Sequence, residues 1–223
     1  MKKFSLTFIL LITCTLSLFG CSCKNKETIS KEEAISVLKE SLVTNNVEII
    51  TTTETIVNNV KTISTQKDVY YGDKYFHLSE STNLSTKTWY GKVNNVLYAF
   101  YYTKNANNEE VKTSSRIENA QLESVQKQPN SIVNSLLNDE GNLPPSYEVT
   151  GSKKGRVYTI QITSNLENES NAYTFTIKDA KINKIVKNSN IASDSIITTY
   201  DYNYEVEEIQ LPTLSEYPLN VNG

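Results

Sequence analysis

Cysteine, histidine and glycine are scarce in this chain, and their scarcity excludes several kinds of active site. The 223 residues include three cysteines, one histidine and seven glycines. A structural zinc site needs four Cys or His ligands, and a phosphate-binding loop needs several closely spaced glycines. We therefore expect neither a metal ion nor a cofactor.

The single histidine also limits catalysis. Any Ser-His-Asp or Cys-His site would have to use His77, and no nucleophile motif lies near it. Adjacent acids such as Glu207 and Glu208 point to opposite sides of a strand, so they cannot act together as acid and base. We expect His77 to lie on a strand face, and we expect the protein not to be an enzyme.

Charge of one sign is not concentrated in any segment. Residues 1–20 contain two lysines and no acid, so residues 21–223 carry 20 basic and 25 acidic side chains, a net charge of −5. Nucleic-acid binding needs clustered Lys and Arg, and no such run is present. We expect no nucleic-acid partner. The length favours one domain, and we expect a monomer.

One long hydrophobic run is present, at the N-terminus. Lys2 and Lys3 precede 17 uncharged residues, 4–20, that are rich in Leu, Ile and Phe. This run is shorter than the ~20 residues that a membrane-spanning helix needs. A positive start followed by a short apolar segment is typical of a secretory signal.

The run ends in Leu18-Phe19-Gly20-Cys21, which resembles the lipobox of bacterial lipoproteins. The resemblance implies cleavage after Gly20 and a diacylglycerol group on the Cys21 thiol, with acyl chains such as palmitate in the membrane. Phe19 is bulkier than the residue usually found at its position. Acylation of the Cys21 amine stays open, and the alternative is a short anchor helix with an incidental cysteine. Each buried CH₂ contributes about 0.8 kcal/mol, so two or three chains hold firmly.

This resemblance divides the chain into a signal peptide at 1–20, a lipidated tether at 21–29 and a single domain at 30–223. It implies a lipid anchor on the extracytoplasmic face of the cell membrane. The abundance of Asn, Thr, Ile, Lys and Tyr indicates an AT-rich genome and a Gram-positive-type bacterium. Once Cys14 has left with the signal and Cys21 is lipidated, Cys23 is the one thiol left, so no intrachain disulfide forms. We expect Cys23 to be an exposed tether residue; the alternatives are pairing with another chain and acylation.

The domain begins with a helix and continues as strands. Ser30 and Glu33 match a capping box, and apolar residues at helical spacing after them predict a helix over 31–43. From residue 47 onward β-branched residues dominate, as they do in strands. Residues 119–138 interrupt the strands with one or two short helices. Turns are predicted at 58–59, 72–73, 94–95, 152–155, 165–171, 179–180 and 188–193.

We therefore predict an α+β, mostly β fold. It is a single, strongly curved antiparallel sheet of about ten strands, an open half-barrel, with an N-terminal helix and a central helical insertion. The order of the elements along the chain, a first helix, an antiparallel meander, a central helical insertion and a closing run of strands, resembles that of the lipoprotein-carrier superfamily. The ending "TTYDYNYEVEEIQLP" at 198–212 resembles that group as well. That group includes the LolA-like outer-membrane carrier and the mycobacterial lipid-binding lipoproteins. The resemblance implies that acyl chains lie between sheet and helices.

Apolar and aromatic residues share one face of three C-terminal strands, because they alternate with polar ones. The candidate cavity-lining residues are Tyr158, Ile160, Tyr173, Phe175, Tyr200 and Tyr202. This face is either the hydrophobic core under the helices or the wall of a ligand cavity. The second interpretation favours a membrane-anchored, non-enzymatic protein that binds a lipid or other amphipathic small molecule under its sheet. The alternative is a structural or interaction module that docks to envelope proteins or wall polymers.

The lipobox interpretation makes the first testable prediction. Cys21→Ser should abolish both signal processing and membrane retention, because the hydroxyl does not accept the diacylglycerol group. Membrane fractions washed with carbonate and compared with the wild type measure this. A Cys21→Ser protein that still stays with the washed membranes would contradict the interpretation.

Overall fold

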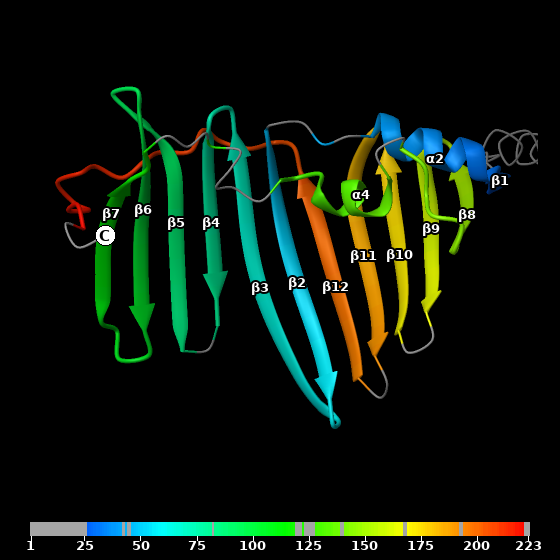
Figure 1. Cartoon of the computed structure of the whole chain (residues 1–223), viewed down its shortest axis with the longest axis horizontal. Coiled ribbons are helices and arrows are strands. Elements are labelled where there is room, and N and C mark those ends of the chain that lie inside the picture. The colour runs from blue at the N-terminus through cyan, green and yellow to red at the C-terminus, as the bar shows by residue number, and fades with distance from the viewer. Residues whose placement is uncertain are drawn as a thin grey trace, which may run out of the picture.

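In the part of the chain that it describes, a computed structural model shows one antiparallel β-sheet with two helices against it (Figure 1). It describes residues 26–220 except 42, 44–45, 82, 119–121, 123–127, 139–140, 167–168 and 192–193. The predicted signal peptide, Gly20 and Cys21 lie outside these residues. Within the described part, no helix is both long and apolar enough to span a bilayer.

The sheet has twelve strands that follow one another mainly through hairpins. The strands are β1 (Glu27–Ile29), β2 (Val47–Val57), β3 (Val60–Tyr71), β4 (Lys74–Glu80), β5 (Leu84–Val93), β6 (Val96–Asn105), β7 (Glu110–Arg116), β8 (Tyr147–Lys154), β9 (Val157–Leu166), β10 (Glu169–Lys178), β11 (Lys181–Ile191) and β12 (Asp194–Asn203). Their order in space is β1-β8-β9-β10-β11-β12-β2-β3-β4-β5-β6-β7. Two meanders, β2–β7 and β8–β12, therefore meet where β12 pairs with β2.

The helices are α2 (Lys31–Glu40) and α4 (Ser131–Leu136). The predicted capping at the start of α2 is confirmed, because the Glu33 amide donates to the Ser30 hydroxyl at 3.1 Å. The helix ends at Glu40, short of the predicted residue 43. The predicted insertion over 119–138 contains α4, and most of the residues before α4 lie outside the described part.

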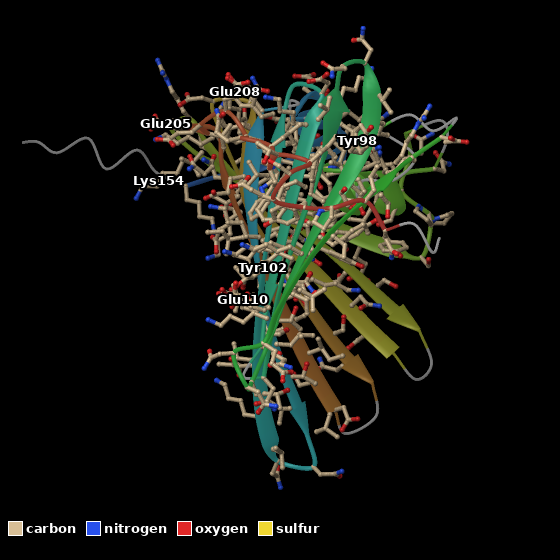
Figure 2. The ribbon with its side chains drawn as sticks, turned by 90° about the vertical axis from the view of Figure 1, so that its left-hand side faces the viewer. Tyr98, Tyr102, Glu110, Lys154, Glu205 and Glu208 are labelled. Carbon is tan, nitrogen blue, oxygen red and sulfur yellow. The ribbon has the colours of Figure 1, made fainter. Side chains whose placement is uncertain are left out.

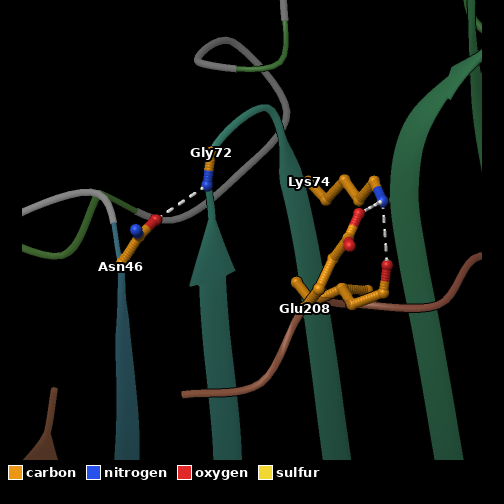
Figure 3. Close-up of polar contacts among 5 residues, drawn as sticks. Asn46, Gly72, Lys74 and Glu208 are labelled. Carbon is orange, nitrogen blue, oxygen red and sulfur yellow. Dashed lines mark hydrogen bonds and ion pairs between the residues drawn. The ribbon is translucent and has the colours of Figure 1, made fainter. Parts of the chain in front are cut away.

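Several tight turns are where the sequence predicts them. Asn58, Asn59, Asn94 and Asn95 all have positive φ, between 51° and 65°. Two such residues in a row give the turn that suits the twist of a hairpin, and asparagine tolerates this conformation. The Gly72 turn is tied to the start of β2, because the Gly72 amide donates to Asn46 Oδ1 at 3.0 Å (Figure 3).

The mostly β class and the single open antiparallel sheet are confirmed, but the number of strands is twelve and not about ten. Residues 27–29, predicted to belong to the tether, form β1 on the edge beside β8. Three residues are too few to show a strand pattern. The strong curvature of a half-barrel stays a prediction.

Three turns in the second meander are shorter than predicted. β8 continues to Lys154 and turns at Gly155, with φ +64°, instead of over 152–155. Likewise β9 and β10 extend into 165–171, and β11 into 188–193. The last strand, which the sequence predicts over 195–209, stops at Asn203. Polar residues are compatible with the solvent face of a ladder, so a run of Asn, Ser and Lys does not by itself end a strand.

The main hydrophobic core lies between the helices and one face of the sheet. α2 contributes Ala34 and Leu38, which are almost completely buried. The sheet contributes seven fully buried side chains to this core, Val47, Ile160, Ile162, Phe175, Ile177, Ile182 and Ile185. Removing this apolar area from water stabilises the fold at about 25 cal/mol per Å².

A second apolar layer lies on the other face of the sheet, at β3–β7. Its cover is the segment after β12, residues 204–220, which we call the strap; it runs along the ends of the strands toward β7 (Figure 1). Tyr217 of the strap packs edge-on against Phe100 and Trp89 at ring-centroid distances of 6.0 and 5.9 Å. The strap then pairs with β7, because the Ser114 amide donates to the Pro218 carbonyl at 2.9 Å. Both edges of the sheet are thus partly covered by terminal segments.

Core packing makes the second prediction. Phe175→Ala should lower the free energy of unfolding by about 3–5 kcal/mol, since the ring is fully buried. Val60→Ala, at a side chain that is 63% exposed, should change it by less than about 0.5 kcal/mol. Urea unfolding followed by circular dichroism measures both. A loss at Phe175 no larger than that at Val60 would mean that its ring faces empty space.

Candidate functional site

The six residues predicted to line a cavity lie on the helix-covered face and join the hydrophobic core. Ile160 and Phe175 are fully buried and lie directly opposite each other on β9 and β10. Tyr202 is 8% exposed, and Tyr158, Tyr173 and Tyr200 are partly buried against the core. Tyr200 and Tyr202 also border a hollow of only about 10 Å³, roughly the room of one water molecule. A cavity for a lipid under this face stays a prediction.

A larger open space lies on the opposite face of the sheet, between β2–β5 and the strap. This groove has a volume of about 490 Å³, within the usual range of small-molecule sites. It is lined from the sheet by Glu48, Lys67, Val69, Phe76, Lys87 and Trp89, and from the strap by Glu205, Val206, Glu207, Ile209 and Gln210.

The floor of the groove is apolar because of the register of three strands. Val69 lies opposite Phe76, and Phe76 lies opposite Trp89, so all three share one face. The Phe76 and Trp89 rings are tilted by 46° at a centroid distance of 5.2 Å. Trp89 is the one tryptophan of the chain.

The strap is fixed as the second wall. Lys74 Nζ donates to Glu208 Oε1 at 2.6 Å and to the Ile209 carbonyl at 3.1 Å (Figure 3). Leu211 lies so close to Gly91 that a Cβ there would be 2.6 Å from Leu211 Cδ1. A glycine in β5 therefore allows the strap to lie directly on the sheet.

The rim of the groove is charged. Lys67 forms an ion pair with Glu48, and Lys87 Nζ lies 5.3 Å from the centre of the Tyr102 ring. Tyr102 in turn donates to Glu110 at 2.8 Å, below Glu205 and Glu208 in Figure 2. Glu205 and Glu207 are exposed, and neither has a cationic side chain within 4 Å in the described part of the chain. Apolar floor and charged rim together suit an amphipathic ligand.

His77 has a partner that sequence reasoning missed. Asp68, only 2% exposed, accepts a hydrogen bond from the Tyr75 hydroxyl at 2.6 Å and lies 2.8 Å from His77 Nδ1. Asp68 and His77 lie opposite each other because a two-residue turn follows Tyr71. The pair could have been predicted from the sequence by counting residues outward from this turn along both strands. Burial, together with the bond to Asp68, raises the pKa of Tyr75 far above its ordinary value.

This cluster does not complete a nucleophilic site. Of the residues described, no Ser, Thr or Cys is hydrogen-bonded to the His77 ring. Nor do three His, Cys, Asp or Glu side chains gather in a way that could hold a metal ion within the described ranges. The phenols of Tyr202 and Tyr204, which pack at the core on the same face of the sheet, stay protonated at neutral pH, because burial raises the pKa of Tyr204 to about 12 and that of Tyr202 further. The geometry fits a structural role for His77.

Comparison with models of known families and with curated proteins gives no match for this chain. The resemblances to lipobox-bearing lipoproteins and to the lipoprotein-carrier superfamily therefore stay predictions. The groove, with its lining residues and charges, is the structural feature that suggests a function.

The third prediction concerns His77. His77→Ala should lower the free energy of unfolding by about 1–2 kcal/mol at most, because the ring is partly exposed and Asp68 keeps its bond from Tyr75. It should leave the biological role intact, as measured by complementing a deletion strain. A folded His77→Ala protein that behaves like the deletion would indicate a catalytic role.

Proposed function

We propose that this protein is a membrane-anchored, extracytoplasmic binding protein, non-enzymatic, that holds a lipid or other amphipathic small molecule. The observation that carries the proposal is the groove of about 490 Å³ between the strands and the strap. The lipobox supports the anchor, since Cys21 follows a short apolar signal.

The groove suits this role better than the face that the sequence suggested. Among the candidate residues on the helix-covered face, Ile160 and Phe175 have no exposed surface. In the groove, by contrast, Phe76 and Trp89 border open space. Binding sites typically combine such an apolar lining with a few placed polar groups.

The second candidate function is an interaction module at the cell surface. The observation that favours it is the β2–β3 hairpin, which extends beyond its neighbours (Figure 1). Val57 and Val60, which lie opposite each other on this hairpin, are 39% and 63% exposed. Exposed apolar residues close together are typical of surfaces that bind other proteins.

The fourth prediction separates the two candidates and the two faces. A dansyl-labelled undecanol, an amphipathic probe without charge, lies near Trp89 when it is bound in the groove, so excitation of the tryptophan should produce dansyl emission. Phe76→Ala removes part of the groove floor and should weaken uptake about tenfold. The matched variant Tyr202→Ala changes the helix-covered face and should leave uptake unchanged. Circular dichroism confirms that both variants are folded.

The reverse pattern, with uptake lost in Tyr202→Ala and kept in Phe76→Ala, would place the ligand under the helices instead. Absence of uptake by the wild type, together with no lipid mass in native mass spectrometry of protein purified from its host, would contradict a binding protein. The interaction module would then be the better proposal.

A further inference from the structure

The groove contains more carboxylates than ammonium groups, and the geometry separates them into two sets. Glu48, Glu205 and Glu207 face Lys67 and Lys87 along its lining. The charges of Glu48 and Lys67 offset each other in an ion pair, which lies at the sheet side of the groove. The charges that the groove offers to a ligand are therefore those of Lys87, Glu205 and Glu207.

Lys87 is already engaged with an aromatic ring. Its ammonium group lies 5.3 Å from the centre of the Tyr102 ring, within the range of a cation–π contact. Glu205 and Glu207 have no such partner in the described part of the chain, and both are exposed on the strap. The neighbouring acid, Glu208, is held by Lys74 and belongs to the fixation of the strap.

The aromatic floor of the groove favours a positively charged ligand, as Glu205 and Glu207 do. The faces of aromatic rings carry negative electrostatic potential, and tryptophan attracts cations most strongly of the aromatic side chains. Trp89 borders the groove and is partly exposed, with Phe76 beside it. A cation in the groove thus meets aromatic rings on one side and unpaired carboxylates on the other, whereas an anion meets repulsion from the strap.

We infer that the groove recognises an ammonium group attached to an apolar body, held against Trp89 by Glu205 and Glu207. The inference rests on the proposed function and names the ligand class of the same site. A trimethylammonium lipid headgroup and a soluble amine share this chemistry. Lys87, at the Tyr102 end, is placed for a negative group of a zwitterionic ligand.

The test uses the purified full chain in dodecyl maltoside, a detergent without charge, and follows the emission of Trp89. The probes are choline and its neutral isostere, in which carbon replaces the ammonium nitrogen. Choline should bind at least about tenfold more tightly than the isostere. Glu205→Gln/Glu207→Gln should remove this preference. Glu32→Gln/Glu148→Gln makes the same charge change at two exposed residues that do not line the groove, and it should keep the preference.

Dodecylphosphocholine, added as a competitor, distinguishes the two sources. If it binds much more tightly than choline, the ligand is a lipid headgroup with its chain; if choline binds equally well, a soluble amine is enough. Either result supports ammonium recognition.

Two results would overturn the inference. One is equal binding of choline and the isostere while the dansyl-labelled alcohol still binds, which leaves the proposed function standing. The other is an equal loss of preference in both double variants, which would assign the effect to overall charge. Failure of the proposed function looks different, because then neither the dansyl-labelled alcohol nor choline binds.

Discussion

The pairing of β12 with β2 holds this structure together. It joins residues about 145 positions apart, from Ser195 opposite Ile56 to Asn203 opposite Glu48. Without it the chain would form two separate meanders, each with an additional open edge. The entropic cost of closing so long a loop grows only with the logarithm of its length, so a ladder of nine residue pairs can offset it.

A consequence of this pairing is that the sheet has two apolar regions on opposite faces. The helices cover the first region, where the C-terminal strands carry fully buried isoleucines. The strap covers the second, because the chain leaves β12 beside β2 and continues over β3–β7. Each cover is a segment that the sheet itself brings into position.

The helices cover their apolar region of the sheet more completely than the strap covers the other one. The candidate site lies where the strap leaves space above the strands. A helix presents a continuous row of side chains to the sheet, as Ala34 and Leu38 do. The strap is a single extended segment, anchored by Lys74 at one place and by Leu211 on Gly91 at another. Between the strap and the strands a groove stays open, with aromatic rings below and carboxylates above. The proposed function therefore depends on the groove that the strap leaves open, and not on a cluster of catalytic residues.

Local patterns in the sequence determined which segments form the first helix, the tight turns and the strands. The Ser30 cap, the Asn-Asn turns and the alternation in the strands each depend on neighbours within a few residues, so the mostly β class and the first helix could be predicted. The apolar face of β9, β10 and β12 was identified correctly as a face. Only the tertiary structure decided that Ile160 and Phe175 on this face are fully buried, that residues 27–29 form an edge strand, and that the groove lies on the other side. Those features depend on contacts between distant residues, such as Leu211 on Gly91 and Asn203 opposite Glu48. The sequence around any one residue does not say which distant segment covers it, because burial depends on the whole fold.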